Sequence, residues 1–225
     1  MRFLIIVAVS ILATSAANGQ NATPNNRLRI DVSAGYGSLH WTTKYSSKVS
    51  SNPQSDPLRD TDFKNTGNAS SIDISLLYMI RKSGFGILLG RRNYKIDELI
   101  SDLSPEITMS IADEHAYLFG GIYNFEIYRV KNFKIKPEIG AGIFSFTDKY
   151  VNKAHDNQFF ITSQIKLEYQ IQNFNFAIAP SYEFVSFKYI LKPIDGTILT
   201  FKDRANLMKI NFGVAYTINK KRSSM

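Results

Sequence analysis

The chain has 225 residues, 44% of them hydrophobic, with a formal net charge of +8 and a mean hydropathy of −0.15. This length suits one domain, and the hydropathy excludes a bundle of membrane-spanning helices. The sequence contains no cysteine, so it allows neither a disulfide framework nor a lipid-modified cysteine. Lys and Arg are scattered along the chain without an aromatic-and-basic cluster, so we expect no nucleic-acid partner.

The N-terminal residues are typical of a secretory signal peptide. One basic residue precedes an apolar run from Phe3 to Leu12, and small residues follow. The run is shorter than the ~20 residues that a helix needs to cross a bilayer. We therefore predict a signal peptide over residues 1–19, cleaved after Ala17 or after Gly19, and a short lead over residues 20–26.

Beyond the lead, apolar and polar residues alternate with a period of two in eight separate stretches. Such alternation is typical of strands with one apolar face and one polar face. Most stretches have ten or more residues, which fits the ~9–11 of a membrane-spanning strand better than the five or six of a soluble one. The predicted strands are residues 27–41, 71–80, 85–94, 117–127, 133–143, 161–171, 174–184 and 208–218.

Short and long connections alternate between these strands. Turns are expected at residues 81–84, 129–132 and 172–173, and long loops at residues 42–70, 93–114, 147–158 and 190–204. Membrane barrels sort their connections in this way. The first long loop is rich in Ser, Asn, Asp and Pro, so we expect it to be mobile and solvent-facing.

The sequence therefore predicts an all-β fold, an eight-stranded antiparallel up-and-down transmembrane β-barrel over residues 27–219. Short turns would face the periplasm, long loops would face the exterior, and both termini would be periplasmic. A polar tail over residues 220–225 closes the chain.

Aromatic residues gather toward the ends of the predicted strands, which is typical of interfacial girdles. Near the turns these residues are Tyr78, Phe85, Tyr128, Phe133, Tyr169, Phe174 and Tyr216, and near the loops they are Trp41 and Tyr150.

The polar register, which should face the lumen, carries both signs of charge. The predicted interior charges are Arg29, Asp31, Asp73, Lys134, Lys136, Glu138, Lys166, Glu168, Glu183 and Lys209. Eight strands enclose a space that side chains just fill, and an unpaired buried charge is costly. We therefore expect a paired network in a mostly filled lumen. A narrow pore lined by Lys and Glu is the alternative.

Inward positions near the loops are more apolar. They include Leu118, Phe144, Phe146, Val185 and Phe187. This pattern indicates either an apolar mouth for a lipid tail or a plug packed by the loops, and we favour the plug.

The three histidines give little sign of catalysis. His40 and His115 fall on the apolar register near strand ends, and His155 falls in a predicted loop. No zinc-binding spacing is present. His40 or His115 with a nearby serine leaves open a rim enzyme that modifies lipid A, but no motif marks such a pair. We predict no catalytic residue, metal site or cofactor, and no enzymatic activity.

The signal peptide, the repeated amphipathic strands and the closing strand MKINFGVAYTI resemble the porin-like outer-membrane β-barrel family. The chain is similar to the small OmpA/OmpX-type and PorT-like barrels over almost all of its mature length. The resemblance implies a Gram-negative envelope protein inserted by the barrel-assembly machinery. It also implies contact with outer-membrane lipid and lipopolysaccharide.

The leading hypothesis is a non-enzymatic surface barrel with a structural, binding or secretion-accessory role. Its extracellular loops would contact an extracellular or envelope protein. A narrow porin-like channel for ions or small solutes is the second hypothesis, and a lipid A-modifying rim enzyme is the third. A soluble periplasmic lipocalin-like barrel is the fourth.

Overall fold

The computed structural model describes residues 26–49, 58–101, 114–146, 155–191 and 197–219. The predicted signal peptide, most of the predicted lead, the polar tail and Tyr150 lie outside these ranges. Within them, no helix is long and apolar enough to cross a membrane.

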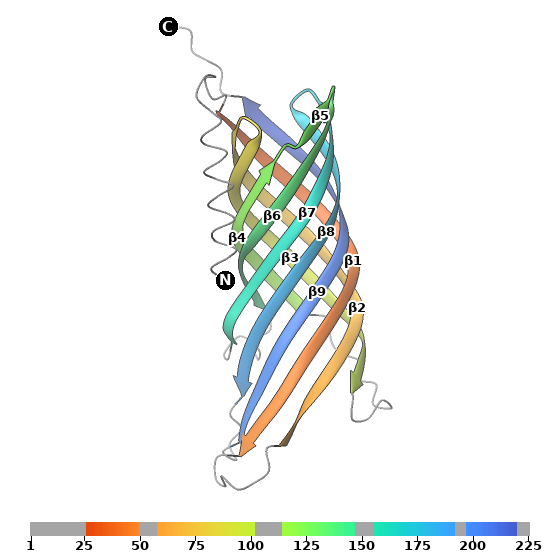
Figure 1. Ribbon diagram of the computed structural model, residues 1–225, viewed down its shortest axis with the longest axis vertical. Helices are drawn as coiled ribbons and strands as arrows, with labels where there is room; N and C mark the ends of the chain where they lie inside the picture. Colours follow the sequence, from red (N-terminus) through yellow and green to blue (C-terminus); the bar gives the residue numbers. More distant parts are fainter. Residues whose placement is uncertain (1–25, 50–57, 102–113, 147–154, 192–196, 220–225) are drawn as a thin grey trace.

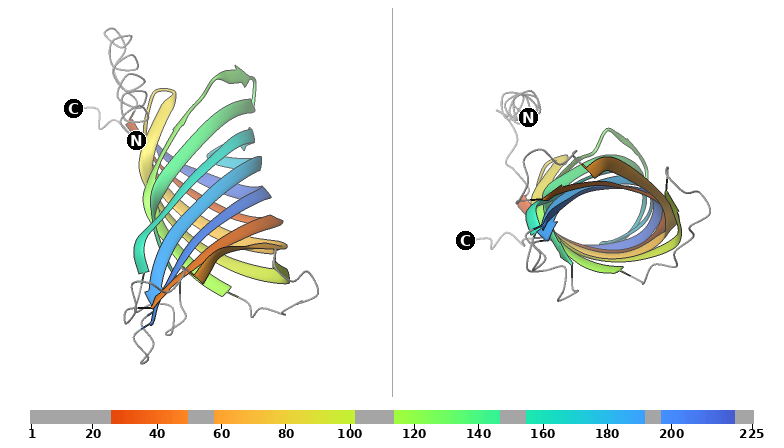
Figure 2. Two further views of the ribbon diagram at one scale, coloured as in Figure 1. Left: turned by 60° about the horizontal axis from the view of Figure 1, so that its bottom comes forward. Right: turned by 90° about the horizontal axis from the view of Figure 1, so that it is seen from below.

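The described residues form one antiparallel sheet that closes into a barrel (Figures 1 and 2). The strands are β1 (Asn26–Val49), β2 (Leu58–Ile80), β3 (Ser83–Ser101), β4 (Glu114–Phe125), β5 (Tyr128–Val130), β6 (Phe133–Phe146), β7 (His155–Ile171), β8 (Phe174–Leu191) and β9 (Thr197–Asn219). β1 pairs with β9, and β4 pairs with β6. Because β4 and β5 are two pieces of one wall strand, the barrel has the eight strands that the sequence predicts.

The register fixes the tilt of the strands. Starting at Arg29, we can pass from each residue to its partner on the next strand until the path returns to β1. It returns at Leu39, ten residues further along the strand. This offset corresponds to a strand tilt of about 40°. A closed sheet of eight strands at this tilt leaves room for interior side chains and for little else.

Two-residue turns connect the strands at one end, called here the turn end. Arg81, Lys131 and Gln172 begin these turns with φ of 54°, 49° and 54°. Positive φ suits hairpin loops of two residues, because it matches the twist of the flanking strands. The turn at 172–173 lies where it was predicted. The other two are shorter than predicted, since Ser83 pairs with Ile80 and the strand continues through Val130.

At the opposite end, called here the loop end, the strands extend further than predicted. β1 continues to Val49 and β2 begins at Leu58, so much of the predicted first loop is paired wall, as in Trp41 opposite Asn65. The prediction that His155 lies in a loop is also wrong, because β7 begins there. Outward side chains above the lipid need not be apolar, so the alternation disappears from the sequence while backbone pairing continues.

A one-residue irregularity interrupts the wall between β4 and β5. Asn124 pairs with Glu138, but beyond the break Tyr128 pairs with Ile135, so the β4–β5 side gains one residue as in a β-bulge. Pro137 lies at this break on β6 and has no N–H to donate. The ladder resumes where Ile127 N donates to Ile135 O at 3.1 Å.

Large apolar side chains cover the outside of the barrel between its two ends. This apolar belt consists of the outward residues of 28–36, 72–80, 85–89, 117–128, 133–143, 159–171, 174–182 and 208–218. On β9 it runs from Met208 to Ile218, which corresponds to about 25 Å along the barrel axis. That is the height of the lipid-facing band of an outer-membrane barrel.

Candidate functional site

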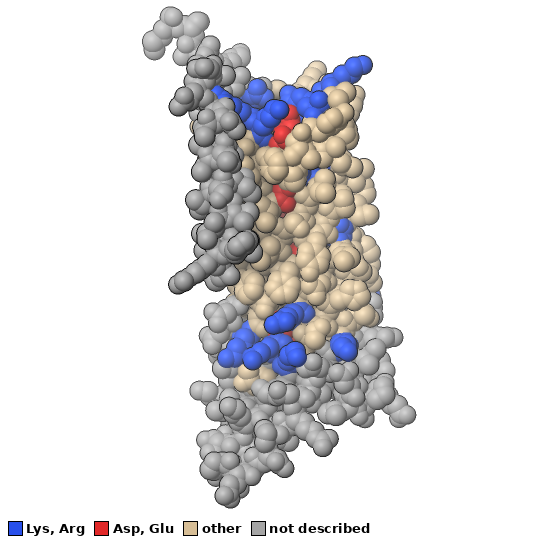
Figure 3. Space-filling view, in the orientation of Figure 1, with Lys and Arg blue, Asp and Glu red and all other residues tan. Residues whose placement is uncertain are grey.

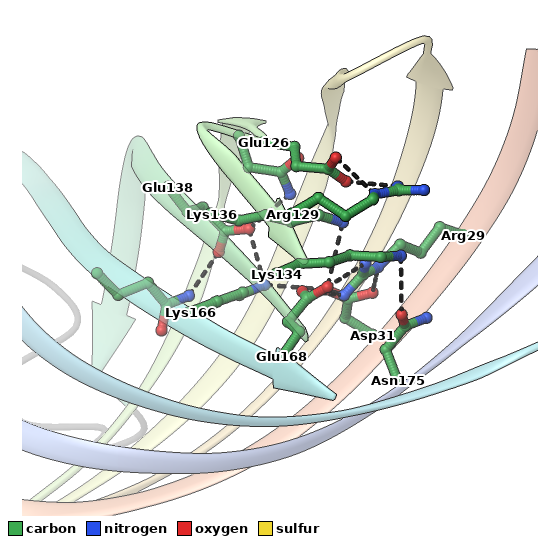
Figure 4. A network of polar contacts seen from close by, with 12 residues as sticks. Arg29, Asp31, Glu126, Arg129, Lys134, Lys136, Glu138, Lys166, Glu168 and Asn175 are labelled. Carbon is green, nitrogen blue, oxygen red and sulfur yellow. Dashed lines mark hydrogen bonds and ion pairs between the residues drawn. The ribbon is translucent and has the colours of Figure 1, made fainter. Parts of the chain in front are cut away.

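Buried charges fill the lumen near the turn end (Figure 4). The charged members of this turn-end network are Arg29, Asp31, Lys136, Glu138, Lys166 and Glu168. The Arg29 guanidinium donates to Glu168 Oε1 at 2.5 Å and Oε2 at 3.0 Å, and to Asp31 Oδ1 at 2.5 Å. Bidentate pairing of this kind fixes geometry as well as adding energy.

Two lysines balance the charge of the turn-end network. Lys166 Nζ lies 2.9 Å from Asp31 Oδ2 and 2.7 Å from Glu138 Oε2. Lys136 Nζ lies 3.1 Å from Glu168 Oε2. Three cations therefore meet three carboxylates, and each carboxylate has a cationic partner. Such compensation is what makes burial of these charges tolerable.

Two further polar pairs lie nearer the turns. Lys134 Nζ donates to Asn175 Oδ1 at 3.3 Å. Arg129 forms a bidentate pair with Glu126, at 2.7 Å from Nε and 2.6 Å from Nη2. The Arg129 side chain is 50% exposed, so this pair lies at the rim of the lumen.

A second cluster, called here the central brace, crosses the middle of the lumen. It consists of Arg92 on β3, Asp73 on β2, Glu183 on β8 and Lys209 on β9. Arg92 Nη2 lies 2.6 Å from Glu183 Oε2, and Arg92 Nη1 lies 2.6 Å from Asp73 Oδ1. Lys209 Nζ lies 3.3 Å from Glu183 Oε2. The two cations and two carboxylates of the central brace therefore sum to zero net charge.

Aromatic side chains occupy the lumen near the loop end. This loop-end aromatic cluster consists of Trp41, Tyr94, Phe144, Phe146 and Phe187, each at most 7% exposed. Ring centroids lie 5.4 Å apart for Trp41 and Phe187, and 4.9 Å apart for Phe146 and Phe187. The interplanar angles are 83° and 64°, and such edge-to-face geometry is favourable for aromatic pairs. Wall residues therefore fill the lumen at this end, and the predicted plug packed by the loops would involve residues outside the described ranges.

The predicted position of Trp41 is wrong. It was expected in an interfacial girdle, but its side chain points into the lumen, and its Nε1 donates to Asp203 Oδ1 at 2.9 Å. Thr43 donates to the same oxygen. Strand alternation explains the placement, because odd-numbered residues of β1 point inward from Arg29 onward. The seven girdle aromatics predicted near the turns do point outward.

A cavity of ≈ 20 Å³ lies between the turn-end network and the central brace. Its lining includes Arg29, Lys166, Gln164 and Asn211. That volume holds about one water molecule. Asn211 Nδ2 donates to Gln164 Oε1 at 2.9 Å, so an amide bridge crosses the space between the two clusters.

The structure brings all ten predicted interior charges into the lumen, where they divide between the two charge clusters and the Lys134 pair. Two further interior charges, Arg92 and Asp203, are not among those predicted from the sequence. Arg92 follows Gly86, Leu88 and Gly90 on the inward register of β3, so continued alternation identifies it. Asp203 lies in a segment that was predicted to be a loop.

Charge is distributed differently on the outer wall. Among the described side chains, every exposed charged residue is Lys or Arg, and the carboxylates are buried or line the lumen. Figure 3 shows these cations near both ends of the wall, with a mostly uncharged surface between them. The apolar belt is therefore bounded by cations on both sides.

Among the described side chains, His115 contacts an amide that in turn contacts a serine. His115 Nδ1 lies 2.9 Å from Asn93 Oδ1, and Asn93 Nδ2 donates to Ser70 Oγ at 3.3 Å. Asn93 thus stands between the imidazole and the hydroxyl, where it cannot relay a proton as a base would. His40 points outward opposite Thr66 and Asn206. The described residues contain no group of three His, Asp or Glu side chains that could hold a metal ion.

No protein-family model matches the chain, and no curated protein matches its sequence. Outer membrane protein AlkL, solved in lipid bilayers, is 12% identical with a TM-score of 0.50, over 92% of this chain and 97% of AlkL. OprG from Pseudomonas aeruginosa is 12% identical with a TM-score of 0.49, over 84% and 96%. Neisserial surface protein A is 14% identical with a TM-score of 0.39, over 81% and 97%. The protein has the fold of the small eight-stranded outer-membrane β-barrels.

Proposed function

We propose that this protein is a non-enzymatic outer-membrane barrel with a closed lumen, which holds its loop end at the cell surface. The turns and both termini would then be periplasmic. The binding, structural or secretion-accessory role would belong to the loop-end connections, where an extracellular or envelope protein would be the partner.

The observation that carries this proposal is the pairing of Arg92 with Glu183. The two residues project from opposite sides of the barrel and meet at 2.6 Å, so a buried ion pair crosses the lumen. The turn-end network lies on one side of this pair and the loop-end aromatic cluster on the other. A solute entering from either end would have to displace compensated charges or packed rings.

Conductance in planar bilayers tests the closed lumen. Purified barrel that shows heat-modifiable migration on a gel should insert without producing steady ion-dependent openings, whereas a reference porin reconstituted in the same way should conduct. Steady openings from the folded protein would support the narrow channel instead and overturn the closed-lumen proposal.

The assignment of the role to the loop end has a separate test. Replacing residues 50–57 with Asn-Gly should leave heat-modifiable migration intact, because β1 and β2 are already paired below this segment. Cells that express the replaced chain should lose cross-links to surface partners. Lengthening the turn at Lys131 and Asn132 by two glycines is the matched control, and it should leave those cross-links unchanged. The same loss of cross-links from the control would contradict the proposal.

The non-enzymatic assignment is tested at the two outward histidines. We expect His40→Ala and His115→Ala to leave the lipid A profile of expressing cells identical to that of the wild type. A modification that appears with wild-type protein and disappears with either variant would establish a rim enzyme.

A further inference from the structure

Asp203 on β9 is the one buried carboxylate in the described part of the chain that contacts no cation. Its side chain lies in the lumen at the loop end and is 3% exposed. The other buried carboxylates each contact Lys or Arg; they are Asp31, Glu126, Glu138, Glu168 and Glu183. Burial of a charge without an opposite charge is costly. Asp203 is therefore the point in the lumen where binding of a cation would gain most.

Both donors that reach Asp203 contact the same carboxylate oxygen. Trp41 Nε1 donates to Oδ1 at 2.9 Å, and the Thr43 hydroxyl donates to Oδ1 as well. Among the described residues, no group donates to Oδ2. A carboxylate accepts up to about four hydrogen bonds, so Oδ2 can accept from a ligand while Oδ1 holds the side chain in place.

A second acceptor lies on the other side of Trp41. Asn65 on β2 is directly opposite Trp41, whereas Asp203 lies on the β9 side of β1. The Asn65 side chain is 4% exposed, and its Oδ1 has no hydrogen-bond partner in the described part of the chain. The unused hydrogen-bonding capacity on both sides of Trp41 is thus that of acceptors, which favours a ligand with several donors.

Aromatic rings make up the rest of the surroundings of Asp203. Phe187 is directly opposite Asp203 on β8. The Trp41 ring lies 5.4 Å from the Phe187 ring, 5.8 Å from that of Tyr94 and 6.1 Å from that of Phe146, measured between centroids. Ring faces attract ammonium groups through their quadrupoles. A carboxylate beside such rings therefore favours an organic cation.

A metal ion fits these surroundings less well. Calcium takes about six to eight oxygen ligands, and the described residues contain no group of three acidic or histidine side chains that could hold a metal ion. An ammonium group needs fewer ligands, because its charge is satisfied by one carboxylate and by ring faces.

The site can be reached from the loop end. Thr43 is directly opposite Asp203 on the inward register of β1, and its side chain is partly exposed. Solvent therefore reaches the lumen at the level of Asp203. A small cation that enters there need not pass the central brace or the turn-end network.

We propose that the loop end of the lumen binds a primary ammonium group at Asp203. The N–H groups of the ligand would donate to Oδ2, and the rings of Trp41 and Phe187 would border the cation. The ligand class is a small aliphatic amine. The site goes beyond the proposed function, because it requires neither the proposed orientation in the membrane nor a partner protein.

Titration of the purified full chain with n-butylammonium chloride in a zwitterionic detergent tests the site, with sodium chloride at equal concentration as the reference. Trp41 is the only tryptophan, and its indole N–H is bound to Asp203, so its fluorescence should report binding. The urea midpoint of unfolding is a second measure, because a ligand that binds the folded barrel stabilises it.

Asp203→Asn is the site variant. It keeps an Oδ1 acceptor for Trp41 and Thr43, but an amide that donates replaces Oδ2. Glu126→Gln is the matched control, because it removes one negative charge at the turn end, where the carboxylate has Arg129 as its partner. Heat-modifiable migration shows that each variant is folded.

The wild type and Glu126→Gln should bind n-butylammonium equally, and Asp203→Asn should bind it at least about tenfold more weakly, since a charged hydrogen bond is lost. Tetramethylammonium, which has no N–H, should bind the wild type more weakly than n-butylammonium does. Equal affinity of the wild type and Asp203→Asn would overturn the proposal. So would an amine titration that changes neither the emission nor the urea midpoint relative to sodium chloride. Should Asp203→Asn fail to fold, the two ammonium ions decide: equal wild-type affinity for both would overturn the proposal.

Discussion

Arg92 and Glu183 meet across the full width of the barrel. Four strand-to-strand steps separate β3 from β8 in either direction around the sheet, yet Arg92 Nε and Nη2 lie 2.9 and 2.6 Å from the Glu183 carboxylate. A pair of one long cation and one carboxylate can thus connect opposite walls. It does so only because eight strands at this tilt enclose so narrow a space.

Removing Arg92 should destabilise the barrel strongly. Arg92→Ala leaves the buried Glu183 and the partly buried Asp73 with Lys209 as the remaining cation of the central brace. Breaking a buried pair in this way costs about 3 to 5 kcal/mol. Urea unfolding from lipid vesicles, followed by heat-modifiable migration, measures the loss. Arg91→Ala is the matched control, because Arg91 is exposed on the outer wall, and it should change the unfolding free energy by less than about 0.5 kcal/mol. Similar losses from both variants would show that the brace contributes nothing specific.

Trp41 is the only tryptophan in the chain, so its fluorescence reports on one site. Because its ring is packed in the lumen, emission should be blue-shifted and should not be quenched by brominated lipids. The double variant Trp41→Phe with Tyr36→Trp moves the reporter to an outward position that is 63% exposed, and its emission should be strongly quenched. Strong lipid quenching of the native tryptophan would place Trp41 in the girdle and contradict the cluster.

A pair of glycines tests how closely the strands approach each other. A Cβ at Gly86 would meet the Leu76 carbonyl oxygen and the Leu77 Cα, which belong to the β2 backbone and cannot move aside. Gly86→Ala should therefore destabilise the barrel by about 1 to 3 kcal/mol, the usual cost of overpacking. At Gly121 the nearest atom to a new Cβ is 3.9 Å away, so Gly121→Ala should be neutral within about 0.5 kcal/mol in the same unfolding assay. The reverse order of costs would contradict the observed strand spacing.

Alternation made most of the barrel predictable from the sequence. Wherever one face touches lipid and the other touches the lumen, the two environments differ enough to leave a period of two, as along Met208 to Ile218. That contrast predicts that Lys209 and Glu183 face the interior, where the structure has them. The alternation fails above the belt, where both faces are polar or mixed, so the sequence predicts a loop around Asp203 where the structure has a strand.

The partners within the lumen were not predictable in the same way. Alternation shows that Arg29 points inward, but the choice of Glu168 as its partner depends on the ten-residue offset of the closed sheet. No local signal carries that offset. The interruption of the strand at Glu126 and Ile127 could not be predicted from local sequence either, because the residue that faces the break, Pro137, lies on the neighbouring strand β6.

The pairing of β1 with β9 has a consequence for chain connectivity. Arg27 and Asn219, near the two ends of the described barrel, are direct cross-strand neighbours at the turn end. The paired strands β1 and β9 therefore have the geometry of a hairpin without a connecting turn. A two-residue linker between the ends, with the chain reopened inside residues 50–57, would give a circular permutant with every strand neighbour preserved. The natural order of the strands along the chain is therefore one of several orders that would form the same barrel.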